Sequence, residues 1–87
     1  MILEPFVLKG TATEEHWEYF SKEIPMRAEK AKQIAEKYGL TFVPLQEKFD
    51  ECATKAPTDY WLRDGVHPTP IGSEIIAREW VRAFKTM

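Results

Sequence analysis

The sequence predicts an α/β fold in which two short strands run parallel and a helical region connects them. The first strand is expected in residues 2–8, which are apolar and β-leaning, and Pro5 restricts that segment to the end or the edge of a sheet. The second strand is expected in residues 40–45. The residues between the two segments carry apolar side chains at helical spacing. Because a helix that connects two strands of one sheet implies a crossover, the strands should be parallel.

Two helices are expected before the second strand. The first begins near Thr11 or Thr13, either of which could cap it, and its apolar residues share one face as far as Pro25. We expect Pro25 to mark a break or the first turn of the next helix. That helix covers residues 26–38 and ends at Gly39, a typical position for a C-cap glycine.

The second half of the chain predicts two more helices separated by a loop. The face of the first consists of five apolar residues and ends at a proline: Leu45, Phe49, Cys52, Ala53, Ala56 and then Pro57. Residues 58–68 read as a loop. Thr69 then caps a final helix over residues 69–84, with Pro70 in its first position.

Composition and charge exclude several classes of function. The 87 residues allow one domain at most, and the net charge of −2 comes from acidic and basic residues that alternate along the chain. Without a basic patch, nucleic acid is not an expected partner. No apolar run approaches the ~20 residues that span a bilayer. A single cysteine, Cys52, and a start unlike a signal peptide suggest a reducing, cytoplasmic setting.

The residues that carry chemistry are concentrated in Asp64-Gly65-Val66-His67-Pro68. A histidine that acts as a general base accepts a proton on one ring nitrogen, and a carboxylate that binds the other nitrogen fixes its tautomer. An aspartate three residues before a histidine, across a turn that contains a glycine, can place both side chains on one side of the loop. The alternative is a purely structural role, in which Asp64 accepts hydrogen bonds from local amides as part of a capping network.

The longer string Asp-Gly-Val-His-Pro-Thr-Pro-Ile-Gly, followed by an apolar helix, resembles the C-terminal signature block of SGNH/GDSL hydrolases. This resemblance implies that Asp64 is the orienting carboxylate and His67 the general base of a Ser-His-Asp triad that cleaves short acyl or acetyl esters. It implies no metal and no organic cofactor. The family fold is a three-layer α/β/α sandwich of the flavodoxin-like kind. Residues 1–87 would form one partial domain with about two of its strands.

The chain departs from the family pattern at the nucleophile. The Gly-Asp-Ser block is absent, as are the Gly and Asn blocks that supply oxyanion donors, and the only serines are Ser21 and Ser73. We therefore expect a truncated form of a longer enzyme that is inactive by itself. Such a form would expose a sheet edge, through which copies could associate.

Two further alternatives stay open at this stage. Trp61 could line the substrate side of the site, or it could cover the end of the sheet as part of the core. The chain could also be a small non-catalytic α/β module that binds a protein partner. A folded monomer in which Asp64 turns away from His67 would favour that second function.

Overall fold

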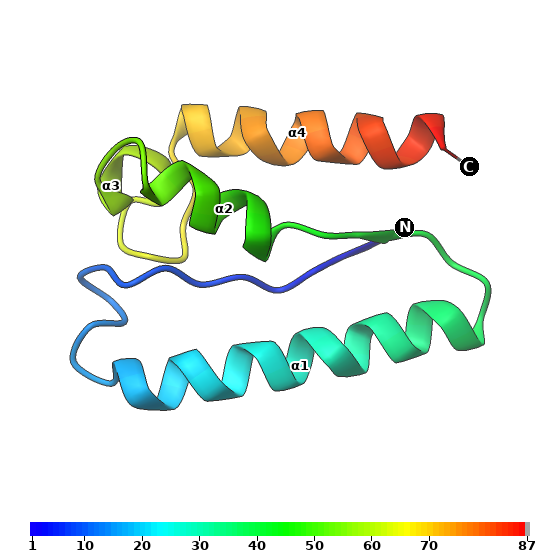
Figure 1. Ribbon diagram of the computed structural model, residues 1–87, viewed down its shortest axis with the longest axis horizontal. Coiled ribbons are helices and arrows are strands. Elements are labelled where there is room, and N and C mark those ends of the chain that lie inside the picture. Colours follow the sequence, from blue (N-terminus) through cyan, green and yellow to red (C-terminus); the bar gives the residue numbers. More distant parts are fainter. Residues whose placement is uncertain (87) are drawn as a thin grey trace.

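A computed structural model describes residues 1–86, which form two parallel strands and four helices in three layers. Figure 1 shows the strands in the middle, with α1 on one face and α4, together with α2 and α3, on the other. This arrangement confirms the predicted α/β fold. In chain order the elements are β1 (Ile2–Leu3), α1 (Trp17–Lys37), β2 (Phe42–Val43), α2 (Gln46–Ala53), α3 (Thr58–Trp61) and α4 (Pro70–Lys85).

The first strand is shorter than the segment from which it was predicted. β1 pairs with β2 in parallel, with Ile2 opposite Phe42, and the Glu4 amide makes the last ladder bond. The ladder stops there because β2 ends at Val43, and the amides of Leu45 and Gln46 that follow it donate to the Glu4 side chain instead. Further along, the Gln46 side chain takes the place of a strand: its Oε1 accepts from the Val7 amide at 2.8 Å and its Nε2 donates to the Val7 carbonyl at 2.8 Å.

The two helices predicted on either side of Pro25 are one continuous helix, α1. A proline inside a helix removes one backbone hydrogen bond and crowds the preceding turn. The helix continues because both of its halves face the same extended segment. Trp17 lies near Val7 and Leu8, and Ala28 lies near Pro5. Burial along this shared face compensates for the missing bond.

The start of α1 differs from the predicted cap, whereas its end agrees with the prediction. At its start the N-cap residue is His16, and no side chain caps the helix; the predicted cap Thr13 is buried elsewhere. At its end the prediction is confirmed. Gly39 has φ 66°, and the Leu40 amide bonds the Ala35 carbonyl at 2.8 Å, as in a Schellman motif.

The core lies between the sheet and the helices that cover its α4 face. Its fully buried side chains come from β2, α2 and the loops beside them: Val43, Leu45, Phe49 and Leu62, with Leu8 packed against them. Phe49 also packs on Phe6, with 4.7 Å between ring centroids. These contacts tie the N-terminal segment to α2.

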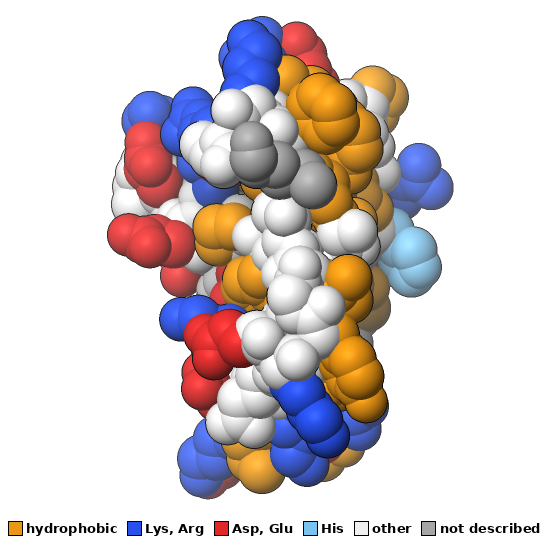
Figure 2. Space-filling model, turned by 90° about the vertical axis from the view of Figure 1, so that its right-hand side faces the viewer, with side chains coloured by type: hydrophobic (Ala, Val, Ile, Leu, Met, Phe, Trp, Pro, Cys, Tyr) orange, Lys and Arg blue, Asp and Glu red, His pale blue; other side chains and the backbone are white. Residues whose placement is uncertain are grey.

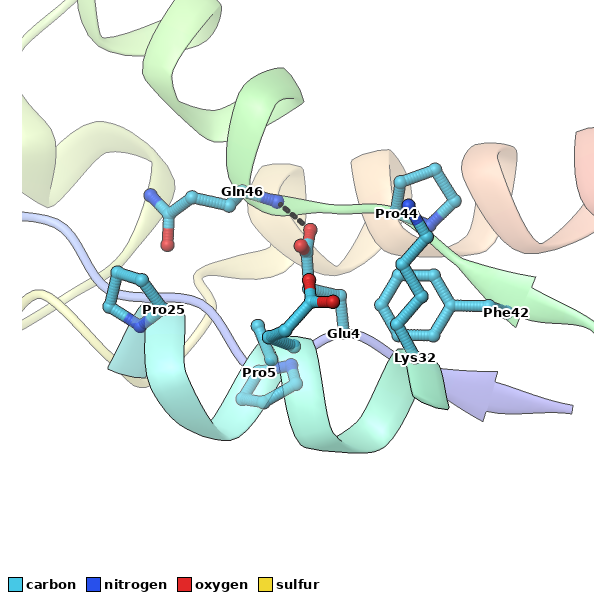
Figure 3. Close-up of a pocket in the computed structure, with 9 residues that line it drawn as sticks. Glu4, Pro5, Pro25, Lys32, Phe42, Pro44 and Gln46 are labelled. Carbon is cyan, nitrogen blue, oxygen red and sulfur yellow. Dashed lines mark hydrogen bonds between the residues drawn. The ribbon is translucent and has the colours of Figure 1, made fainter. Parts of the chain in front are cut away.

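Glu4 caps α2 from a distance in sequence. One of its carboxylate oxygens accepts from the Leu45 amide at 2.7 Å and from the Gln46 amide at 2.8 Å. Figure 3 shows the second of these bonds. A negative charge at a helix N-terminus is favourable, because it meets free N–H groups and the positive end of the helix dipole. Glu4 therefore links the end of β1 to the start of α2.

The molecule is a thin slab. Its principal extents are 36 × 26 × 17 Å, and the shortest axis is the direction of view in Figure 1. Large apolar side chains are half exposed, among them Leu3 of β1 and the stacked rings of Trp80 and Phe84 on α4. Figure 2 shows apolar side chains gathered along one side of the molecule. No helix among residues 1–86 combines the length and apolarity needed to cross a bilayer.

Candidate active site

Asp64 and His67 face each other within the loop between α3 and α4. His67 Nδ1 lies 2.6 Å from Asp64 Oδ2, which is hydrogen-bond distance. The His67 side chain is 74% exposed, whereas that of Asp64 is 26% exposed. The carboxylate is thus held by the protein while most of the imidazole faces outward. Among residues 1–86 no hydroxyl group bonds either nitrogen of this ring.

The second oxygen of Asp64 is bound by the backbone of the same loop. Oδ1 accepts from the His67 amide at 2.8 Å and from the Val66 amide at 3.0 Å. The His67 amide, then the His67 ring and the Val66 amide, hold the pKa of the Asp64 carboxyl well below its usual range. Asp64 therefore caps local amides and orients the histidine at once, so the two alternatives from the sequence coexist in one structure.

The bonds of the Asp64 carboxylate should persist to a lower pH than those of an ordinary aspartate. Since the folded-state pKa of Asp64 is lowered, the unfolded chain takes up the proton first as the pH falls below ~3.9, and only there does the stabilising contribution of Asp64 begin to fade. The carboxyl carbon of Asp64, followed by NMR, should accordingly titrate below ~3.9. Asp64→Asn provides the control, because it should remove this part of the acid dependence of unfolding. An ordinary titration midpoint would contradict the prediction.

The loop that carries the pair is closed on itself. The Arg63 amide donates to the His67 carbonyl at 2.7 Å, and Leu62 and Pro68 form an isolated antiparallel bridge. Gly65, with φ 104°, permits the tight path between them. The predicted cap is confirmed at the exit, where Thr69 Oγ1 accepts from the Gly72 amide at 3.1 Å. His67 is thereby held just before the start of α4.

A second support comes from the turn formed by residues 8–13, which sequence reasoning missed. The Leu8 amide donates to the Gly65 carbonyl and the Ala12 amide to the Asp64 carbonyl, both at 2.9 Å. Thr13, which is 1% exposed, donates its hydroxyl to the Leu8 carbonyl at 2.7 Å. From the sequence Thr13 is expected only as a helix cap, because the contacts of this turn with Asp64 and Gly65 are tertiary.

Trp61 lies at the edge of the core. Its indole N–H donates to the Ala56 carbonyl at 3.3 Å, and its ring packs against the hydrophobic core and edge-on against Tyr60. The side chain is partly buried. These contacts account for Trp61 as a core residue, and the role in substrate binding predicted from the sequence stays a prediction.

The remaining candidates lie apart from the pair. Ser21 Oγ donates to a carbonyl within α1, and Cys52 is buried as a free thiol. A cavity of about 490 Å³ lies between α1 and the strands, lined by Glu4, Lys32 and their neighbours (Figure 3), and neither Asp64 nor His67 lines it. Residues 1–86 contain no cluster of three His, Cys, Asp or Glu side chains that could hold a metal ion.

Comparison with known proteins identifies the fold. No model of a protein family matches the chain, and none of the curated proteins matches it. Among solved structures, a protein from Parabacteroides merdae described as a GDSL-like lipase superposes with a TM-score of 0.85 and 34% sequence identity. The match covers 93% of this chain. The chain is similar to a part of a GDSL-like lipase. The resemblance deduced from the Asp64–His67 string is confirmed over nearly all of its residues.

The match covers only part of the Parabacteroides protein. The chain spans 37% of the length of the Parabacteroides protein. Its two parallel strands and four helices are therefore the counterpart of a part of a GDSL-like fold, as predicted. The activity of a whole GDSL-like protein comes to this chain only as a proposal.

Proposed function

We propose that this chain supplies the general base and the orienting carboxylate of a serine ester hydrolase that cleaves short acyl or acetyl esters. His67 is the base and Asp64 the orienting carboxylate. The observation that carries the proposal is the 2.6 Å contact between Asp64 Oδ2 and His67 Nδ1, in a chain similar to a GDSL-like lipase. A hydrogen bond on Nδ1 fixes the tautomer that leaves Nε2 free to accept a proton.

The reaction would follow from that tautomer. A serine hydroxyl would give its proton to His67 Nε2 as its oxygen bonds the acyl carbon, and the proton would pass to the leaving alcohol as the ester bond breaks. Water would then release the acyl group by the same route. Asp64 would stabilise the imidazolium throughout. Its low pKa suits this role, because the carboxyl stays ionised beside the charged ring.

The serine is the part that the 87 residues lack. Ser21 lies within α1 and Ser73 in the first turn of α4, and neither has the exposed strand-to-helix turn of an activated nucleophile. The chain alone should therefore hydrolyse p-nitrophenyl acetate no faster than its His67→Ala variant does. Turnover that disappears in the variant would mean that the chain carries its own nucleophile.

A chimera tests the proposal itself. The segment of the Parabacteroides protein that matches this chain would be replaced by residues 1–87, after the intact protein has been shown to hydrolyse p-nitrophenyl acetate. We expect the folded chimera to retain hydrolysis. A smaller graft of residues 58–70 alone covers the case in which the large one does not fold. A folded graft without activity beside an active parent would refute the proposal.

The same chimera resolves the role of Trp61. If this side chain lines the substrate site, Trp61→Ala should raise KM more than it lowers kcat, since it would remove contacts that exist before the transition state. Because Trp61 also packs on the core, the folded state of the variant must be checked by circular dichroism. An unchanged KM in a folded variant would assign Trp61 to the core alone.

We also propose that copies of the chain associate through the sheet edge. β1 pairs on one side with β2, and Leu3 in β1 is 46% exposed. Unpaired strand edges bind other strands readily. Sedimentation should show dimers or larger species whose population rises with concentration, and Leu3→Lys should reduce them. A compact monomer across the concentration range would contradict this prediction.

A cytoplasmic location is consistent with the single, buried thiol of Cys52, and fractionation of cells that produce the chain would test it. The alternative function, a non-catalytic module that binds a protein, would be favoured by Asp64 turned away from His67. The pair is formed, and this geometry does not favour that alternative.

A further inference from the structure

The turn of residues 8–13 contacts the backbone of Asp64 more closely than its distance in sequence suggests. Both carbonyls of the Asp64-Gly65 dipeptide are occupied by amides of this turn: Ala12 donates to Asp64 and Leu8 to Gly65, each at 2.9 Å. The carboxylate of Asp64 is fixed by its own loop, whereas its main chain is fixed by the turn. The position of the loop on the fold therefore depends on a second segment.

Gly10 is shaped for this contact. A Cβ atom at Gly10 would lie 2.6 Å from the carbonyl carbon and oxygen of Asp64 and from the Gly65 amide nitrogen. All of these are backbone atoms, which cannot rotate away as the end of a side chain can. Any other residue at this position would push the turn and the Asp64 loop apart. The absence of a side chain at Gly10 thus serves the loop that carries the candidate pair.

Thr13 holds the turn in the shape that makes this contact. Its hydroxyl donates to the Leu8 carbonyl at 2.7 Å and accepts from the Gly10 amide at 2.9 Å, so it joins both ends of the turn. The residue is 1% exposed, and a Cβ at Gly65 would come within 2.8 Å of its Oγ1. A buried hydroxyl with two backbone partners is costly to remove, because those partners lose their bonds without gaining water.

We infer that Gly10 and Thr13 are positioning residues for the Asp64–His67 pair, acting through the main chain of Asp64 and Gly65. The inference rests on the proposed function for its significance in catalysis, but not for its geometry. The turn would set where the carboxylate stands relative to the sheet and keep the two bonds to its Oδ1 short. Without the bonds between the turn and the loop, the Asp64 carboxylate could move away from the Val66 and His67 amides and from the His67 ring.

The test follows the pair itself by NMR in the 87-residue chain. Two readouts report on it: the Nδ1 proton of His67, which a short bond to a carboxylate shifts far downfield, and the titration midpoint of the Asp64 carboxyl carbon. In Gly10→Ala and Thr13→Val we expect the downfield proton to be lost and the Asp64 midpoint to rise by about one pH unit or more toward its ordinary value. Thr13→Ser keeps the hydroxyl and should restore both readouts.

Gly39→Ala is the matched control. Gly39 has positive φ, so alanine there strains the backbone, but its Cβ would meet nothing within 4 Å, and it caps α1 rather than the site. It should lower the unfolding midpoint and leave both readouts unchanged. Wild-type readouts in folded Gly10→Ala and Thr13→Val would overturn the inference. So would unfolding of both while Thr13→Ser stays folded, because the turn would then serve the fold as a whole.

The chimera separates this inference from the proposed function. If Gly10→Ala and Thr13→Val lose the two readouts while the chimera is inactive, the inference about the turn stands and ester hydrolysis is refuted. If both variants keep the readouts while the chimera is active, ester hydrolysis stands and the inference about the turn is refuted.

Discussion

Replacing His67 by alanine in the active chimera is expected to lower kcat/KM for p-nitrophenyl acetate by roughly 10³–10⁴-fold or more, as for members of a catalytic triad. The imidazole faces outward from Asp64, and in the proposed mechanism it is the group that would move the proton of a serine. Asp64→Asn should cost a comparable or somewhat smaller factor. It keeps the imidazole but disturbs its tautomer, since an amide in place of the carboxylate can donate to Nδ1.

Two matched variants control for the loss of a charge or a ring. His16 is the other histidine of the chain; it lies exposed at the N-terminus of α1. Asp59 is exposed in α3, close in sequence to Asp64. His16→Ala and Asp59→Asn should leave the rate unchanged. A His67→Ala chimera with near-normal kinetics would remove His67 from the mechanism, whatever the effect of Asp64→Asn.

Truncation of Phe49 is expected to have the largest effect on stability. The ring is fully buried, packs on Phe6 and lies within the cluster that joins the sheet to α2. Phe49→Ala should lower the free energy of unfolding by about 3–5 kcal/mol, through lost burial and the cavity left behind. Small domains have only about 5–15 kcal/mol in total, so urea titration should find the variant largely or wholly unfolded.

Phe84→Ala makes the matched comparison, because it deletes the same atoms from a residue that is 57% exposed. Its ring stacks on Trp80, with 5.6 Å between centroids. The loss should be about 1 kcal/mol or less, since few buried contacts disappear. Similar losses for the two variants would mean that the core does not lie around Phe49.

Local signals in the sequence predicted the elements that depend on neighbouring residues. Gly39 ends α1 because a residue with positive φ completes the cap, and Thr69 starts α4 because its hydroxyl reaches the next turn. The Asp64–His67 contact is of this kind, since three residues separate the partners. Such features are encoded within a few positions, so a pattern suffices to predict them.

Features that depend on distant partners were not predictable in this way. Thr13 looks like a helix cap until Leu8 and the Asp64 loop enclose it. Pro25 looks like a helix break until packing on both of its sides carries α1 through it. Glu4 caps α2 across 41 positions, which no local pattern contains. In each case tertiary contacts outweigh the local preference of the residue.

The contact between the turn of residues 8–13 and the Asp64 loop also bears on the order of folding. The amides of Leu8 and Ala12 meet carbonyls more than 50 positions later in the chain, and closing a loop of that length costs conformational entropy before any bond forms. Contacts of this kind come late in folding, after helices such as α1 have formed locally. During synthesis, too, the turn emerges first and stays hydrated until Asp64 has been made. The loop that carries the candidate pair would thus bind the turn among the last steps of folding, on a fold already in place.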